Sequence, residues 1–317
     1  MINRSCLKWP GGKGSIVNDI KKHLPVGKRL IEPFVGAGNV FINTDYDGYI
    51  LNDINEDLID MYKMLLSHPE KFINDLWLEF QDSNTPADYA LNRSWFNRLA
   101  PEISFSERWK KSLLFVYLNR HGYNGLCRYS DKSGFNVPFG KYKKVYFPRA
   151  ELKLFAEKLG KATLMCGDFE SVINKAVRGD VVYCDPPYIP VSSTSDFTQY
   201  YGANFTVHDH KRLRNALLKA VGRGASVVLS NSDTALAQYL YHCFVIKKIK
   251  THRSIGAAAG SRKGITELIV IKTPSLKVCD GCGHTGGGKC PDCGPAMGDA
   301  TYNEMLGKEC FDDVEAF

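Results

Sequence analysis

The sequence predicts an α/β protein built around an open, mainly parallel sheet, with an inserted, mainly helical segment and a small module at the C-terminal end. Short apolar runs bounded by turn residues recur along the chain, which is typical of buried parallel strands. This pattern stops between about residue 69 and residue 150 and then resumes. After residue 273 the composition changes to glycine and cysteine. Because open α/β sheets bind ligands beyond the carboxyl ends of their strands, the residues that follow each strand are the candidates for function.

The first motif is Lys8-Trp9-Pro10-Gly11-Gly12-Lys13. The glycine pair lets the backbone approach a ligand, and two cations and an indole surround it. Apolar residues at helical spacing follow from residue 16 until Pro25. We interpret the motif as a loop over a pocket, with Trp9 and Lys13 as candidate ligand contacts. The alternative is an exposed basic turn before an amphipathic helix.

A strand at 29–31 leads into Glu32-Pro33-Phe34-Val35-Gly36-Ala37-Gly38, and a helix start is expected near Phe41. Gly36 and Gly38 permit a tight turn and the close approach of a nucleotide-like ligand, with Phe34 beside them. Phe41 stands where a dinucleotide fingerprint has its third glycine. A cofactor without a pyrophosphate therefore fits better, which favours S-adenosylmethionine over NAD.

A second strand, at 49–51, ends in Asn52-Asp53. Asp53 lies about where a Rossmann-type fold places a carboxylate on ribose hydroxyls, although it could also cap the following helix. A later strand, at 162–166, ends in Gly167-Asp168-Phe169. Asp168 either faces a bound adenine or caps a helix, and both alternatives stay open.

The strand of residues 181–184 ends in Asp185-Pro186-Pro187-Tyr188. The prolines have no N–H groups and fix the backbone, so the carbonyls of Asp185 and Pro186 are rigid acceptors. Acceptors beside the Tyr188 ring suit an amino group on a planar heterocycle such as adenine. Asp185, Pro186 and Tyr188 are the candidate catalytic residues. A strand that ends in a proline turn with a surface tyrosine is the alternative.

The segment of residues 57–144 combines predicted helices at 72–80 and 106–120 with a basic, aromatic stretch at 119–144. Arginine and lysine neutralise phosphates, asparagine pairs with adenine, and tyrosine stacks on bases. This is the best candidate for nucleic-acid contact, and an ordinary polar insertion is the alternative.

The rest of the predicted sheet follows Tyr188. Residues 189–206 have no periodicity, and we expect them to be mobile and to close over substrate. A basic amphipathic helix is predicted at 207–221 and a buried strand at 225–231. Two closing strands are predicted at 244–250 and 265–272, joined by a flexible segment.

The net charge is +7, and the six carboxylates of residues 299–317 oppose a single lysine, so the rest of the chain is more basic still. A polyanionic partner is therefore expected. No apolar run is long enough to cross a bilayer, and the N-terminal residues lack a signal-peptide core. We expect a cytoplasmic protein whose scattered cysteines are reduced thiols.

The chain resembles the Dam family of bacterial and phage DNA adenine-N6 methyltransferases. The resemblance covers most of residues 4–272 and rests on a series of motifs: Lys-Trp-x-Gly-Gly-Lys, Glu-Pro-Phe-Val-Gly-Ala-Gly, Asn-Asp-Ile-Asn, Asn-Arg-x-Gly-Tyr-Asn-Gly-Leu-Cys-Arg, Phe-Asn-Val-Pro-Phe-Gly, Asp-Pro-Pro-Tyr and Ser-Asn-x-Asp-Thr. Pro10 departs from the alanine often found in the first motif.

The resemblance implies a Rossmann-like S-adenosylmethionine-dependent fold, with catalytic residues in 1–56 and 145–273 and a target-recognition domain in 57–144. It implies that Trp9, Lys13 and Asp53 contact S-adenosylmethionine, that Asp185 lies between donor and target adenine, and that GATC is read, with Arg128 on guanine. We take as candidate cofactor contacts Trp9, Lys13, Phe34, Gly36, Gly38, Asp53, Asp168 and Asp185. Candidate contacts to double-stranded DNA are Arg120, Tyr123, Asn124, Leu126, Arg128, Pro138, Lys141 and Tyr142.

Two Cys-x-x-Cys pairs, Cys279/Cys282 and Cys290/Cys293, lie in the extension of residues 274–317. Four thiolates can form a closed, structural tetrahedral site, so a bound zinc ion is the leading hypothesis for a zinc-knuckle-like module. Redox-active or free thiols are the alternative. The extension could tune DNA binding or dock a partner protein.

The predicted function is therefore methyl transfer from S-adenosylmethionine to the exocyclic amine of a flipped adenine in duplex DNA, by a monomer or weak dimer. No covalent enzyme intermediate is needed. The alternative is a catalytically inactive protein of the same fold that binds DNA and acts through its zinc tail. Methylation of RNA or of a side-chain amide is a third reading, for which Asn-Pro-Pro-Tyr would be the better sign.

Overall fold

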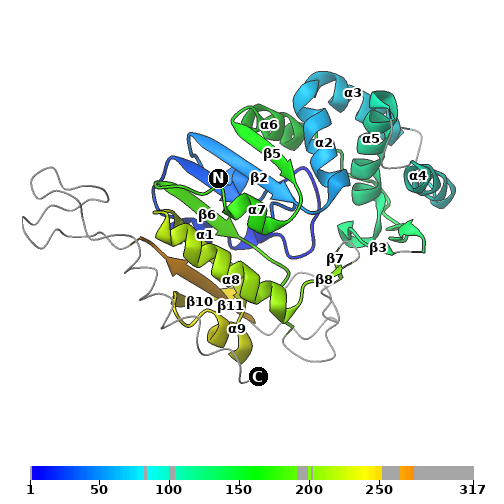
Figure 1. Cartoon of the computed structure of the whole chain (residues 1–317). Coiled ribbons are helices and arrows are strands. Elements are labelled where there is room, and N and C mark those ends of the chain that lie inside the picture. The colour runs from blue at the N-terminus through cyan, green and yellow to red at the C-terminus, as the bar shows by residue number, and fades with distance from the viewer. Residues whose placement is uncertain are drawn as a thin grey trace, which may run out of the picture.

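The computed structural model describes residues 2–81, 84–99, 104–130, 132–190, 199–200, 203–251 and 265–274. Its centre is a seven-stranded sheet (Figure 1). In spatial order the strands are β10 (Val245–Thr251), β11 (Ile265–Lys272), β9 (Ser226–Ser232), β6 (Asp180–Cys184), β1 (Arg29–Glu32), β2 (Gly48–Asp53) and β5 (Ala162–Cys166). The five strands from β9 to β5 are parallel; β11 runs antiparallel to β9, and β10 runs antiparallel to β11. The predicted parallel sheet and its two closing strands are confirmed.

Helices cover both faces of the sheet. They are α1 (Val17–His23), α2 (Glu56–Ser67), α3 (Pro69–Gln81), α4 (Pro86–Arg98), α5 (Phe105–His121), α6 (Arg149–Leu159), α7 (Phe169–Ile173), α8 (Val207–Gly222) and α9 (Ala235–Leu240). Successive residues of a strand point to opposite faces. Accordingly, Val182 packs in one cluster with α7, α8 and α9, while its neighbours Val181 and Tyr183 pack in the other with α1, α2 and α6.

The helices α2 to α5 gather beside the β5 edge of the sheet (Figure 1). Their buried side chains belong to the same hydrophobic cluster as one face of the sheet, so this part of the core is continuous. The division into a catalytic and a recognition domain at residues 57–144 stays a prediction. No helix in the described ranges is both long and apolar enough to span a membrane.

The glycine-rich turn after β1 is not followed by the α-helix that the sequence predicts. The chain instead makes one 3-10 turn, η2 (Phe41–Asn43), and enters β2 directly. The ring of Phe41 packs edge-on against Tyr49 and Phe155. The buried Phe41 side chain thus packs between β2 and α6, in the segment where the helix was expected.

Sequence periodicity also missed α4, which lies between the two helices predicted at 72–80 and 106–120. This helix buries only Tyr89 and Phe96, so its apolar pattern is weak. Its start nevertheless carries a local signal. Thr85 and Asp88 form a reciprocal capping box, and Pro86 stands in the first turn.

The segment after α5 forms a short turn, η3 (Tyr123–Gly125), and a small hairpin of β3 (Tyr129–Ser130) and β4 (Gly134–Phe135). Asn97 of α4 fixes the hairpin, because its amide donates to the carbonyls of Ser133 and Phe135 at 2.9 and 3.0 Å. A second small hairpin, β7 (Gln199–Tyr200) and β8 (Ala203–Asn204), precedes α8. The rest of the predicted mobile segment, residues 191–198 and 201–202, lies outside the described residues.

Candidate active site

Asp185 follows β6 at the carboxyl edge of the sheet and is the centre of a polar network. Its Oδ1 atom lies 2.9 Å from Nζ of Lys13 and accepts a hydrogen bond of 2.9 Å from Oγ of Ser230. The Lys13 side chain is 7% exposed and that of Asp185 22% exposed, so water screens the ion pair only partly. Lys13 also donates to the Gly11 carbonyl at 2.6 Å. The first glycine-rich motif therefore reaches the end of β6.

Tyr188 and the backbone after Asp185 are held by β9 and β11. The Tyr188 hydroxyl donates to Glu267 at 2.7 Å, and Nζ of Lys13 lies 4.6 Å from the centre of its ring. Asn231 accepts from the backbone N–H of Ile189 at 3.2 Å. Pro186 is buried. Asp185, Pro186 and Tyr188 thus form one fixed segment beside Lys13, and burial raises the pKa of the Tyr188 phenol well above its ordinary value.

Asp53 does not cap the helix that follows it. One carboxylate oxygen accepts from the backbone N–H of Gly36 at 2.9 Å, and the other accepts from Asn55 at 3.0 Å. Asn55 is the cap of α2, since its side chain accepts from Leu58. Burial raises the pKa of Asp53, and hydrogen bonds from the backbone of Asn55, Gly36 and Ile54 oppose this rise. Asp53 therefore ties the end of β2 to the glycine-rich turn after β1.

The two glycines of this turn have different neighbours. Gly36 has φ +47°, and a β-carbon there would meet the Trp9 indole at 2.9 Å. Gly38 has φ +66°, and a β-carbon would meet the Phe155 ring at 2.8 Å. Gly36 thus permits the indole of the first motif to lie against the turn, whereas Gly38 permits close packing on α6.

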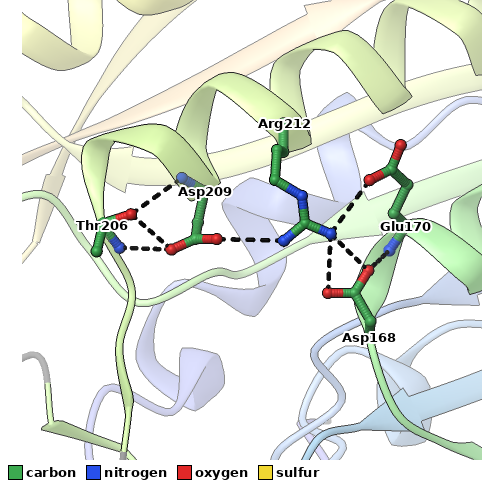
Figure 2. Close-up of polar contacts among 5 residues, drawn as sticks. All are labelled: Asp168, Glu170, Thr206, Asp209 and Arg212. Atoms are coloured by element: carbon green, nitrogen blue, oxygen red, sulfur yellow. Dashed lines mark hydrogen bonds and ion pairs between the residues drawn. The ribbon is translucent and has the colours of Figure 1, made fainter.

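Asp168 caps α7, as one of the two alternatives predicted, because its carboxylate accepts from the Glu170 backbone at 2.9 Å. Figure 2 shows that it also shares the Arg212 guanidinium with Glu170 and Asp209, at N–O distances of 3.0 to 3.2 Å. These pairs raise the pKa of Arg212 and join α7 to the first turns of α8. A contact of Asp168 with a cofactor stays a prediction.

Phe34 lies in an aromatic group beside this charged cluster. Its ring centre is 5.4 Å from that of Phe169 and 5.8 Å from that of Phe205. Arg212 lies over the Phe169 ring at 4.9 Å. The group provides apolar ring faces on the α7–α8 side of the sheet edge, where a flat heterocycle could pack.

Three buried polar atoms in the described part of the chain lack a hydrogen-bond partner: Oε1 of Glu32, Oδ1 of Asn52 and Nδ2 of Asn231. They belong to the last residues of β1, β2 and β9, at or near the same edge of the sheet. Buried polar groups without partners are costly, so a ligand with donors and an acceptor would stabilise this edge. S-adenosylmethionine carries both kinds of group and fits on this ground.

Burial of Glu32 at this edge should make the free energy of unfolding depend on pH. Burial, and secondarily the charge of Asp185, raise the pKa of Glu32 from 4.5 to about 8. The folded protein therefore keeps the proton at pH values where the unfolded chain has lost it, so this residue makes the free energy of unfolding fall as pH rises from 4.5 to about 8. We expect Glu32→Gln to be more stable than the wild type by about 3 kcal/mol at pH 7, with the difference vanishing near pH 4. Urea unfolding at both pH values measures this; a difference independent of pH contradicts it.

The loop of residues 8–13 connects the Asp185 network with the basic, aromatic stretch. Lys8 exchanges hydrogen bonds with Asn119 through its backbone, at 2.9 and 2.7 Å. Its ammonium lies 3.9 Å from the centre of the Tyr142 ring, and a β-carbon at Gly125 would collide with its side chain. One loop thus contacts η3 at one end and Asp185 at the other.

Most of the predicted DNA contacts lie together around η3 and the β3–β4 hairpin. Tyr123 is 51% exposed, and its backbone N–H donates to Pro138 at 2.8 Å. The backbone N–H of Asn124 donates to the Tyr142 hydroxyl at 3.0 Å. Arg128, Pro138 and Lys141 are exposed, while Leu126 is partly buried against the core. Tertiary structure therefore brings together residues 123–142 in one place.

Arg120 differs from the other candidates because it is buried. It is 7% exposed, and its guanidinium donates to the Tyr146 carbonyl at 3.3 and 3.2 Å. Burial lowers its pKa. In this structure Arg120 connects α5 to the segment before α6, and its contact with DNA stays a prediction.

Sequence reasoning did not name the residues of β9 and β11 that hold Asp185 and Tyr188. Ser230, Asn231 and Glu267 come from these strands. The signal was present in Ser230-Asn231, polar residues at the end of an apolar strand. The predicted zinc ligands Cys279, Cys282, Cys290 and Cys293 lie outside the described residues.

Comparison with known proteins points to the same family that the sequence motifs resemble. Residues 9–255 match the family described as D12 class N6 adenine-specific DNA methyltransferase. The chain is 44% identical over 275 residues to a DNA adenine methylase of Vibrio cholerae, covering 86% of this chain and 97% of the relative. Identity is 45% over 271 residues to that of Serratia marcescens, covering 85% and 98%. It is 42% over 275 residues to that of Escherichia coli K12, covering 86% and 97%.

Similarity to solved structures is more distant. A putative methyltransferase complexed with SAH is 11% identical, with a TM-score of 0.35 over 83% of this chain and 52% of that chain. An rRNA methylase from Streptococcus thermophilus is 8% identical, with a TM-score of 0.34 over 87% and 99%. The family match and the identity to the bacterial methylases decide the assignment: this chain belongs to the D12 class of N6 adenine-specific DNA methyltransferases.

Proposed function

We propose that the protein transfers a methyl group from S-adenosylmethionine to the exocyclic amine of an adenine flipped out of duplex DNA, within GATC. The observation that carries this proposal is the Asp185 network. A carboxylate, a tyrosine ring and a buried ammonium lie together at the sheet edge, and one loop links them to η3 and Tyr142, among the candidate DNA contacts. The proposed DNA contacts are the seven exposed or partly buried candidates other than Arg120.

S-adenosylmethionine supplies an electrophilic methyl group when bound. Trp9, Lys13 and Asp53 would hold it, with Phe34, Gly36, Gly38 and Asp168 around them. The unpartnered atoms of Glu32 and Asn52 support a ligand at this position. Because Asp53 already binds the Gly36 N–H, it would fix the glycine-rich turn against the cofactor as well as contact it.

The chain's own residues would act on the target amine. The lone pair of an exocyclic amine is delocalised into the ring, which makes it a poor nucleophile. Acceptors at the Asp185 side chain and the Pro186 carbonyl would draw the N–H groups out of the ring plane, while Tyr188 packs on the base. The carboxylate also stabilises the positive charge that develops on nitrogen during transfer. No covalent bond to the enzyme is required.

Lys13 contacts both the Asp185 carboxylate and the Tyr188 ring. Its ammonium pairs with the Asp185 carboxylate and lies over the Tyr188 ring, which an incoming base would also use. An isolated buried charge would be costly, so each partner of this ion pair offsets the cost of burying the other. The inactive alternative is less well supported, because a DNA-binding module has no evident need for Lys13, Asp53 and Asp185 together.

The direct experiment is incubation with tritiated S-adenosylmethionine and two duplexes that differ only in GATC. Label in the GATC duplex, recovered as N6-methyladenine, supports the activity and its sequence preference. Equal labelling of both duplexes would retain the activity and reject the specificity. DNA binding without label would favour the inactive alternative, and label in RNA alone would change the substrate class.

We further propose that the extension binds one zinc ion through Cys279, Cys282, Cys290 and Cys293. Two Cys-x-x-Cys pairs separated by a glycine-rich stretch support a closed thiolate site. We expect about one equivalent of zinc per chain in native, unchelated protein, measured by elemental analysis, since the four sulfurs complete one tetrahedral site. Less than about half an equivalent would count against the site. Cytoplasmic location, a monomeric or weakly dimeric state and a protein partner for this extension stay predictions.

A further inference from the structure

A buried pair of hydroxyl groups lies beneath Asp185. Ser230 in β9 is fully buried, and Tyr183 in β6 is 2% exposed. The Tyr183 hydroxyl lies 3.1 Å from Oγ of Ser230, which lies 2.9 Å from Oδ1 of Asp185. Neighbouring strands place the three residues side by side, because Cys184 pairs with Leu229 in the β6–β9 register.

The direction of these hydrogen bonds follows from the charge. A serine hydroxyl has one proton, and an ionised carboxylate is a stronger acceptor than a phenol or the Cys184 carbonyl, which lies 3.4 Å from Ser230 Oγ. Ser230 therefore donates to Asp185, and Tyr183 donates to Ser230. Burial raises the pKa of the Tyr183 phenol, so it keeps its proton at neutral pH.

Both protein donors use the same carboxylate oxygen. Lys13 and Ser230 contact Oδ1, and no hydrogen bond to Oδ2 occurs within the described ranges. Lys13 is the first residue of a single 3-10 turn, η1 (Lys13–Ser15), whereas Ser230 and Tyr183 come from two central strands of the sheet. The strands therefore supply the more rigid support for the carboxylate plane.

We propose that Ser230 and Tyr183 are positioning residues, whose relay of two hydrogen bonds holds Oδ1 of Asp185 and leaves Oδ2 for the target amine. The inference rests on the proposed function, in which Asp185 accepts an N–H of adenine. Neither residue touches the reacting atoms. Their effect is to fix the orientation of an acceptor that must meet a pyramidal nitrogen in the transition state.

The test compares Ser230→Ala, Tyr183→Phe and the double variant in single-turnover methylation, with DNA and S-adenosylmethionine saturating. We expect each single variant to lose about 10- to 100-fold in rate, because each breaks a relay that ends on a charged group. The double variant should be no slower than the slower single variant. DNA and cofactor dissociation constants should stay within about twofold, since the relay contacts neither ligand.

Two controls separate positioning from a loss of folding. Ser112→Ala removes another buried serine hydroxyl, on α5 away from Asp185, and should lower stability without changing the methylation rate. Ser230→Thr keeps the hydroxyl and should restore most of the rate. Circular dichroism confirms that each variant is folded.

A rate for Ser230→Ala within twofold of wild type would overturn the inference. Fully multiplicative losses in the double variant would also overturn it, because independent residues do not form a relay. Failure of the proposed function gives a different result, since the wild-type protein itself would then leave DNA unlabelled.

Discussion

Asp185→Asn is expected to lower the methylation rate by about 100- to 1000-fold, the scale seen when one preorganised electrostatic group is removed from an active site. The amide keeps the shape of the side chain but loses the negative charge that would stabilise the developing cation on the target nitrogen. It also leaves the ammonium of Lys13, 2.9 Å away, without its counter-ion. DNA affinity should change little, because the candidate DNA contacts between Tyr123 and Tyr142 are untouched. Single-turnover rates and fluorescence anisotropy measure the two quantities.

Asp180→Asn is the matched control for this variant. Asp180 is a buried carboxylate at the other end of the same strand and pairs with Arg29 at 2.7 Å. Its replacement removes a buried charge from β6 away from the active site, so stability should fall while the rate per folded molecule stays the same. Full activity in Asp185→Asn would defeat the mechanism, as would an equal loss of rate in both variants.

Arg128→Ala is expected to lower kcat/KM on GATC by about 10- to 100-fold and to remove discrimination at one guanine, because one bidentate arginine–guanine contact contributes about 1–3 kcal/mol. The structure supports this choice. Arg128 is exposed, and its Nε donates to Asn136 at 2.7 Å. Its Nη2 also donates to the Asn136 carbonyl at 3.4 Å, so Asn136 holds the edge of the guanidinium that Nε and Nη2 form. Methylation of GATC and of duplexes with single guanine substitutions measures the effect.

Lys132→Ala is the control for Arg128. Lys132 is an exposed cation in the turn between β3 and β4. If it contacts phosphate, its removal should weaken binding to every duplex alike and reduce the salt slope by about one. If Arg128→Ala also weakens all duplexes equally, Arg128 is a phosphate contact and another residue reads the guanine.

The sequence was sufficient for the elements whose local pattern is strong. The apolar runs before Asp53 and Asp185 became β2 and β6, since buried strands inside a parallel sheet are apolar on both faces. The run before Asp168 became β5, a partly exposed strand at the edge of the sheet. The sequence was insufficient where few side chains determine the packing. The expected helix near Phe41 is a single 3-10 turn, in which the Phe41 ring packs on Phe155. Helix α4 buries only two residues, too few to produce a helical period in the sequence.

The sequence by itself determined the family, the order of the strands along the chain and the group of residues from Tyr123 to Tyr142, because these depend on motifs and on patterns a few residues long. Only the tertiary structure decided how each charge is used. In the folded protein Arg120 is buried, the Asp53 carboxylate accepts from the Gly36 backbone, and Asn55 caps α2. Lys13 and Ser230 both contact the same carboxylate oxygen of Asp185. The reason is physical: a hydrogen bond or an ion pair depends on distances of about 3 Å between residues far apart in the chain, and local sequence patterns do not specify such distances.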